Sequence, residues 1–172
     1  MHSNASIFML AGTETTATLL SGVTYHLLLP ANRDKLERLK REIRSAFRDS
    51  PSDGGEGGFT LEGLQRLKYL TACLEEGLRL YPPVPSPLWR VTPEGEGNVI
   101  CGVQVPGGMR VAVPGYVAYR SERNFRDADE FVPERWLFGD GEDAERKGYY
   151  EGDRREALQP FSLGPRNCLG KK

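Results

Sequence analysis

The 172-residue sequence predicts a mainly α-helical fold that carries a small β element. Two observations predict the helices. Apolar residues recur at helical spacing within residues 31–47, with charges on the opposite face, and leucines recur at similar spacing within residues 64–78. A third observation predicts the β element, because valines alternate with other residues on both sides of a Pro-Gly-Gly turn in residues 103–113. With 38% hydrophobic and 27% charged residues, the composition is that of an ordinary globular protein.

The first predicted helix covers residues 7–28, and Pro30 ends it because proline cannot continue the helical hydrogen-bond pattern. This stretch is long enough to suggest a membrane span. It nevertheless contains Glu14, His26 and several threonines, and a carboxylate near the centre of a bilayer costs about 2.5–3.5 kcal/mol. A helix buried within protein is therefore the preferred interpretation.

Two further helices follow, separated by the polar, glycine-rich stretch 49–58, which is the best internal break in the sequence. The second helix covers residues 31–47. The third begins near Thr60, whose side chain can cap it, and ends before the proline-rich stretch YPPVPSP. Residues 120–159 have no regular pattern and are expected to form a packed meander. The predicted buried side of the third helix consists of Leu64, Leu67, Leu70, Leu74 and Leu78.

Charge and cysteine content restrict the possible partners and the compartment. The formal net charge of −1 provides no overall attraction to nucleic acid or to anionic lipid, so we expect no nucleic-acid partner. Cys73, Cys101 and Cys168 are odd in number and have no paired spacing, which argues against a disulfide framework and for a reducing compartment. The first residues lack the basic region of a secretory signal.

The last residues, GPRNCLGKK, are compatible with more than one kind of site. A phosphate-binding loop requires G-x-x-x-x-G-K-[ST], but Gly164 and Gly170 are one residue too far apart, and Lys172 occupies the hydroxyl position. A zinc site would need a second cysteine at C-x-x-C spacing from Cys168, and none is present. Both interpretations are therefore disfavoured.

Cys168 could also be a buried structural cysteine or the reactive thiol of a redox module. Its surroundings favour a ligand site instead, because the two glycines let the backbone approach a ligand closely and Arg166 places positive charge near the sulfur. A thiolate ligand needs such cations, amide donors or a metal to stay ionised.

The string Phe161-x-x-Gly164-x-Arg166-x-Cys168-x-Gly170 resembles the haem-ligand loop of the cytochrome P-450 family, the haem-thiolate monooxygenases. It contains five matching identities within ten positions, so a chance match is rare. The resemblance implies that the Cys168 thiolate is the axial ligand of the haem iron. It also implies that the other four residues bind the cofactor, with Arg166 as an anchor for a haem propionate.

The stretch AGTETT, residues 11–16, resembles the long oxygen-binding helix of the same family, expected here at residues 3–29. In the family, the small pair Ala11 and Gly12 would form the groove for dioxygen. Glu14 and Thr15 would form the acid–alcohol pair that relays protons and would be the catalytic residues. Taken without the cysteine loop, the same stretch also fits a threonine-rich buried helix.

Glu76 and Arg79 are three residues apart in a predicted helix at 60–81, so their side chains can pair. An exposed pair of this kind contributes only about 0.3–0.5 kcal/mol. The resemblance implies instead a buried structural triad, completed by Arg135 of the downstream Pro-Glu-Arg, that holds the meander beneath the cysteine loop. Arg90, after the proline-rich turn, resembles a second haem-propionate anchor.

The resemblance covers residues 1–172 and predicts one partial cytochrome P-450 domain in the style of eukaryotic, fungal members. Its expected parts are the oxygen-binding helix 3–29, the Glu-x-x-Arg helix 60–81, the β element 98–118, and the meander with the haem-ligand loop 120–172. Family members are more than twice as long, so we expect the C-terminal half of the fold, truncated at both ends.

The resemblance also implies a function. A b-type haem and dioxygen would insert one oxygen atom into a small apolar substrate. Electrons would come from NADPH through a flavoprotein reductase, or from an iron–sulfur donor. The sequence leaves the location of the chain itself undetermined, whereas a full-length parent is expected on the cytoplasmic face of the endoplasmic-reticulum membrane. The alternative is a non-catalytic remnant that cannot hold haem stably by itself.

Overall fold

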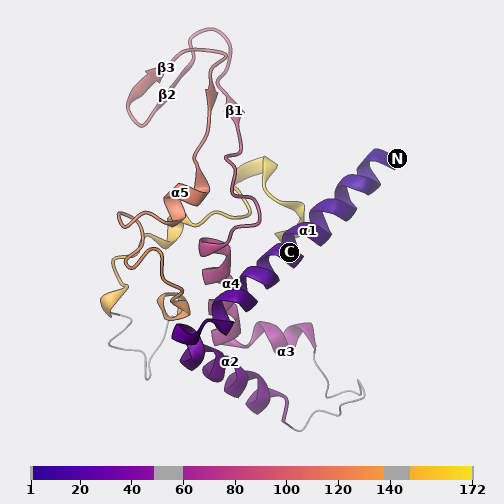
Figure 1. The fold of residues 1–172 in the computed structure, drawn as a ribbon. Coiled ribbons are helices and arrows are strands. Elements are labelled where there is room, and N and C mark those ends of the chain that lie inside the picture. Colours follow the sequence, from indigo (N-terminus) through magenta and orange to yellow (C-terminus); the bar gives the residue numbers. More distant parts are fainter. Residues whose placement is uncertain (1, 49–59, 138–147, 172) are drawn as a thin grey trace.

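The computed structural model describes residues 2–48, 60–137 and 148–171, and the predicted break at 49–58 lies outside them. The fold is mainly helical with two small antiparallel sheets, as the sequence predicted (Figure 1). Helix α1 crosses helix α4, and the N-terminal half of α1 extends beyond the other helices (Figure 1). The helices are α1 (His2–Leu28), α2 (Arg33–Ala46), α3 (Leu61–Gln65), α4 (Lys68–Leu80) and α5 (Gly115–Tyr119), and the strands are β1 (Arg90–Val91), β2 (Asn98–Ile100), β3 (Val103–Val105) and β4 (Arg110–Val111).

Helix α1 ends where the proline predicts. Leu29, which precedes Pro30, has an extended backbone with φ −62° and ψ 137°. The ring of a proline disfavours helical geometry at the preceding residue, which accounts for this conformation. A short 3-10 helix, η1 (Pro30–Asn32), then leads directly into α2.

The predicted helix at 60–81 is two helices in the structure, α3 and α4, because Leu67 has an extended backbone with ψ 100°. The Glu42 carboxylate on α2 accepts hydrogen bonds from the backbone amides of Tyr69 at 2.8 Å and Leu70 at 2.9 Å. It thereby satisfies amides in the first turn of α4 that have no partner within the helix. A distant side chain thus starts α4 at Lys68, which local sequence could not indicate.

Thr60 caps α3 as predicted, since its Oγ1 accepts a hydrogen bond from the Gly63 amide at 3.0 Å. Replacing Thr60 with alanine should cost about 1 kcal/mol of helix stability, because this amide loses its acceptor. Hydrogen exchange of the Gly63 amide should become several-fold faster in Thr60→Ala and stay close to that of the native chain in Thr60→Ser. Equal exchange in all three proteins would contradict the capping role.

The β element differs from the prediction in where its turn lies. Strands β2 and β3 pair through Cys101 and Gly102, whose positive φ angles of 50° and 79° are typical of a two-residue hairpin turn. The predicted turn, residues 106–108, instead joins β3 to β4, which pairs with β1 in another sheet. Thr92 stabilises this arrangement, because its hydroxyl donates to the Pro106 carbonyl at 2.6 Å. Residues 115–119, expected within the β element, form α5.

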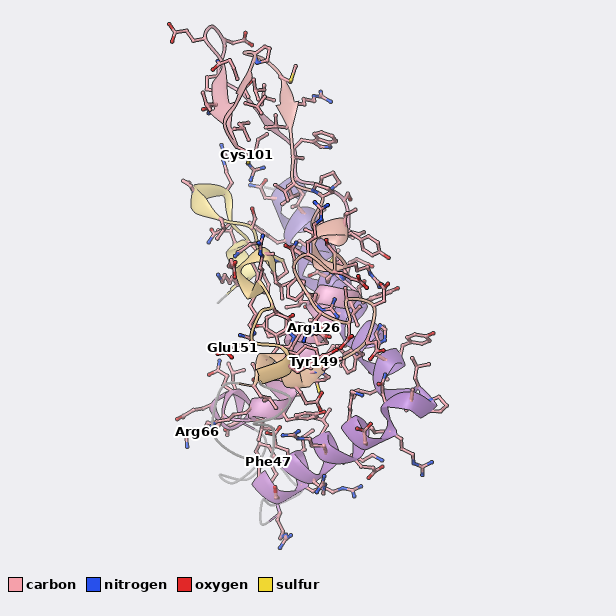
Figure 2. All side chains as sticks on the ribbon, turned by 90° about the vertical axis from the view of Figure 1, so that its left-hand side faces the viewer. Phe47, Arg66, Cys101, Arg126, Tyr149 and Glu151 are labelled. Atoms are coloured by element: carbon pink, nitrogen blue, oxygen red, sulfur yellow. The ribbon has the colours of Figure 1, made fainter. Side chains whose placement is uncertain are left out.

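The β2–β3 hairpin projects away from the helices (Figure 1), and Figure 2 shows that it carries Cys101. Val99 and Val103, on opposite strands of the hairpin, are each more than half exposed. No helix in the described part of the chain has the apolar length that crossing a bilayer requires.

The core consists of two buried clusters. The first lies where α1, α2 and α4 meet, and the second lies beneath α5 and the meander. Of the five leucines predicted to be buried on the third helix, Leu67 and Leu78 are buried and the other three are half-buried. The first cluster contains Val23, Leu27, Leu39, Tyr69, Cys73, Leu80 and Phe131, and the second contains Tyr119, Phe125, Ala128 and Leu158.

Candidate functional site

A buried charged network joins α4 to the meander. The Glu76 carboxylate accepts two hydrogen bonds from Arg79, at 2.8 and 2.9 Å, and one from the Nε of Arg135 at 3.2 Å. All three side chains are fully buried. The structure therefore brings together the three residues that the resemblance groups as a triad, with Arg135 supplied by the 3-10 helix η2 (Pro133–Trp136).

The Glu76 carboxylate has further donors around it. The Val132 amide donates to it at 2.8 Å and the Trp136 indole Nε1 at 2.9 Å. The Arg79 guanidinium in turn donates to the carbonyls of Tyr119, Ala128 and Glu130. Carboxylate and guanidinium thus both bind backbone of the segment 119–132, so α4 is the rigid element against which the meander is held.

The sequence interpretation missed Asp153, which is buried beside the same network. The Nη1 of Arg135 donates to Asp153 Oδ2, and the amide of Arg126 donates to its Oδ1 at 2.8 Å. No periodic pattern pointed to Asp153. A charge count would have indicated that two arginines facing one carboxylate need another negative group, but it would not have identified which acid supplies it.

The cysteine loop begins at residues that the second core cluster holds. The Gln159 amide donates to the Tyr119 hydroxyl at 3.1 Å. The amide of Cys168 then donates to the carbonyl of Phe161 at 2.8 Å and closes the loop. Gly164 has φ +78°, a conformation that favours glycine. Within the loop lie two short 3-10 helices, η4 (Gly164–Arg166) and η5 (Leu169–Lys171).

Cys168 is exposed and is not in a disulfide, so its sulfur is available to a ligand. A Cβ placed on Gly170 would lie 3.8 Å from this sulfur, so the glycine leaves space beside it. Leu163 and Leu169 on either side are 66% and 81% exposed. A free sulfur between exposed apolar side chains suits a large, flat, mostly apolar group such as haem.

The other residues predicted for this loop have different exposures. Gly164, Arg166 and Gly170 are exposed, and Phe161 is half-buried. The Arg166 guanidinium is therefore on the surface of the loop, two residues from the cysteine. It can reach an acidic group on a ligand without breaking a buried contact.

The α1 residues that the family resemblance singled out lie on an exposed part of the helix. Ala11, Gly12 and Glu14 are exposed, and Thr15 is half-buried. The Thr15 hydroxyl donates to the Ala11 carbonyl at 2.6 Å, and a Cβ added to Gly12 would meet nothing within 4 Å. In the described residues this stretch is therefore not buried, contrary both to the alternative of a threonine-rich buried helix and to the expectation that residues 7–28 form a helix buried within protein. The neighbouring Ile7, Phe8, Met9 and Leu10 are each more than 60% exposed.

Arg90 lies in β1, where its exposed guanidinium donates to the Trp89 carbonyl at 3.1 Å. Across residues 2–48, 60–137 and 148–171, no hydrogen bond or ion pair joins Arg90, or residues 11–15 of α1, to the cysteine loop. The structure thus assembles the triad and the loop, and leaves these other candidates separate.

The other two cysteines lie outside the cysteine loop, in α4 and in the β2–β3 hairpin. Burial, with the charge of Glu134 adding to it, raises the pKa of the Cys73 thiol to about 12, so Cys73 stays protonated at neutral pH. Cys101 is exposed on the projecting hairpin. In the described residues, no three His, Cys, Asp or Glu side chains gather as a metal-binding cluster.

Comparison with known proteins identifies the family. The family model described as Cytochrome P-450 matches residues 1–172. The chain is 54% identical over 171 residues to the cytochrome P-450 monooxygenase FUM2 of Gibberella moniliformis, covering 99% of this chain and 33% of the relative. It is 51% identical over 173 residues to the monooxygenase efuB of Hormonema carpetanum, covering 99% and 31%.

A third fungal relative is the averantin hydroxylase of Aspergillus parasiticus, 48% identical over 172 residues, with 100% of this chain and 31% of the relative covered. The chain thus spans about a third of the length of the curated relatives that it matches. The match includes every residue of the buried network and of the cysteine loop. The chain belongs to the cytochrome P-450 family.

Proposed function

We propose that this chain supplies the haem-thiolate part of a monooxygenase that inserts one oxygen atom from dioxygen into a small apolar organic substrate. The observation that carries the proposal is the cysteine loop, with an exposed free sulfur between Gly164 and Gly170. Family membership supports the same conclusion. When bound, haem b supplies the one-electron and dioxygen chemistry that amino-acid side chains lack.

Each residue of the loop has a distinct task in this proposal. Cys168 Sγ would hold the haem iron, and a thiolate there would donate electron density toward the metal. Gly170 keeps the space beside the sulfur open, and the carbonyl of the half-buried Phe161 accepts the hydrogen bond from the Cys168 amide that closes the loop. Arg166 and Arg90 bind the two propionates, because a guanidinium matches a carboxylate with paired donors.

In this proposal Glu14 and Thr15 of α1 transfer protons. The Thr15 hydroxyl donates a hydrogen bond to the Ala11 carbonyl, so its oxygen lone pairs are available to accept a hydrogen bond from another donor. Glu14 is exposed and can exchange protons with water. In this proposal the Thr15 hydroxyl takes up a proton from Glu14 as it releases its own proton, which turns away from the Ala11 carbonyl, to a small molecule lying over Ala11 and Gly12, where no side chain obstructs it. Glu14 then regains a proton from water.

The remaining parts of the proposal concern the whole protein. Electrons come from NADPH through a flavoprotein reductase or from an iron–sulfur donor, and the protein lies at the cytoplasmic face of the endoplasmic reticulum. The names of relatives support a hydroxylation, since one of them is called an averantin hydroxylase. The apolar substrate is proposed to face α1, where Phe8 and Met9 are exposed.

A second candidate is a chain that does not hold haem stably by itself and has no activity alone. The observation that favours it is exposure, because Cys168, Arg166 and Glu14 are all on the surface. A haem bound only there would be open to water on part of its surface.

One spectroscopic experiment tests both candidates. The 172-residue chain is supplied with haemin, reduced and treated with carbon monoxide. The haem proposal expects the red-shifted Soret band of thiolate ligation in the native chain and in Cys101→Ser, and its loss in Cys168→Ala. A band that survives in Cys168→Ala would overturn the ligand assignment, and no band in the native chain would support the second candidate.

A further inference from the structure

We propose that Asp153 is a positioning residue that neutralises the buried Glu76–Arg79–Arg135 triad and thereby fixes the segment that leads to Cys168. The link to Cys168 as a ligand rests on the proposed function, whereas the charge balance does not. Asp153 comes late in the meander, far in sequence from Glu76 and Arg79.

Charge balance is the first argument. The triad sets two guanidinium groups against one carboxylate, and all three side chains are fully buried. The net positive charge would lie in a low-dielectric interior, where an uncompensated ion is strongly unfavourable. The Asp153 side chain, 2% exposed, contacts the guanidinium of Arg135 and supplies the missing negative charge.

The neighbouring acids have other partners. The Asp127 carboxylate accepts a hydrogen bond from the Tyr150 hydroxyl at 2.9 Å, and only the Asp127 backbone carbonyl accepts from Arg135, at 3.3 Å. Glu134 accepts from the Tyr69 hydroxyl at 2.9 Å and lies 3.8 Å from Arg38. Among the described acids, Asp153 is therefore the one whose carboxylate is bonded to Arg135 together with Glu76.

Asp153 also ties three parts of the meander together. Its Oδ1 accepts from the Arg126 amide at 2.8 Å, while its backbone amide donates to the Tyr150 carbonyl at 3.1 Å. The next residues repeat the linkage, since the Nε of Arg155 donates to the Arg135 carbonyl at 2.8 Å. Figure 2 shows Arg126 and Tyr149 close together, and the Arg126 guanidinium lies 4.3 Å from the centre of the Tyr149 ring.

A short path connects this cluster to the cysteine loop. The 3-10 helix η3 (Arg155–Ala157) follows directly, and Leu158 then enters the second core cluster. Gln159 is held by the Tyr119 hydroxyl, and the loop closed by Phe161 and Cys168 begins two residues later. A displacement at residue 153 therefore moves the residues on which the loop is anchored.

A double-mutant cycle tests the charge balance. Asp153→Asn keeps the size of the side chain but removes its charge, and should lower the folding equilibrium constant at least about tenfold, because Arg135 then lacks its second carboxylate. In an Arg135→Gln background the same change should have a much smaller effect, since the charge that Asp153 neutralises is absent. Asp127→Asn is the matched control and should leave the equilibrium constant within about twofold. Equal effects of Asp153→Asn in both backgrounds would overturn the proposal.

A haem readout tests the positioning role separately. At a temperature where the far-ultraviolet circular dichroism is native, Asp153→Asn should shift haem from the thiolate-ligated band toward the unshifted band, and Asp127→Asn should not. An unchanged ratio in Asp153→Asn would overturn the positioning role even if the cycle shows coupling. Coupling without any thiolate band in the native chain would instead overturn the proposed function and leave the charge balance supported.

Discussion

Replacing Glu76 with alanine should destabilise the fold by about 3–5 kcal/mol, which is typical of breaking a buried ion-pair network by removing one partner. The change would leave Arg79 and Arg135 as buried positive charges without their shared carboxylate. It would also deprive the Val132 amide and the Trp136 indole of their acceptor. Urea denaturation followed by circular dichroism would measure the loss in the free energy of unfolding.

The adjacent Glu75 offers a matched control for this experiment. It lies on the same helix and is half-buried, and burial raises the pKa of its carboxyl group. It belongs to no buried ion pair in the described residues, so Glu75→Ala should change the stability by less than about 1 kcal/mol. Similar losses for the two variants would show that Glu76 contributes through its general burial and not through its network.

Gly77→Val should destabilise the fold by about 3 kcal/mol, the upper part of the usual range for overpacking. Helices α1 and α4 approach closely at two glycines. A Cβ on Gly77 would lie 2.2 Å from Val23 Cγ2, and a Cβ on Gly22 would lie 2.5 Å from the ring of Tyr81. A valine at Gly77 must push α1 away from α4, and thermal unfolding of the variant would show the loss as a lower midpoint.

Two comparisons test whether the contact between Gly77 and Val23 causes this loss of stability. Gly77→Ala should cost less in a Val23→Ala background, because the methyl group that would clash is then absent. Gly12→Ala on the exposed part of α1 should be neutral or stabilising by up to about 1 kcal/mol, because a Cβ there meets nothing and alanine favours helix. If Gly77→Ala costs the same with and without Val23, the close contact between α1 and α4 is not what limits the site.

Local sequence features were sufficient for several conclusions. The helical spacing in residues 31–47, the proline that ends α1 and the Thr60 cap all depend on neighbours a few positions away. The same holds for the string from Phe161 to Gly170, whose spacing indicated the cytochrome P-450 family, and the family match confirms that membership. Features of this kind can be read from the sequence because they are encoded within one or two turns of chain.

Other features depend on residues that only folding brings together. Glu42 starts α4 from another helix, Thr92 moves the β turn, and Asp153 neutralises a triad whose first member is far away in sequence. The close approach of α1 and α4 at Gly22 and Gly77 is of the same kind. A periodic pattern specifies which face of a segment is buried, but it does not specify the partner that covers it. Buried charges and glycine contacts therefore become visible only when the partner is in place.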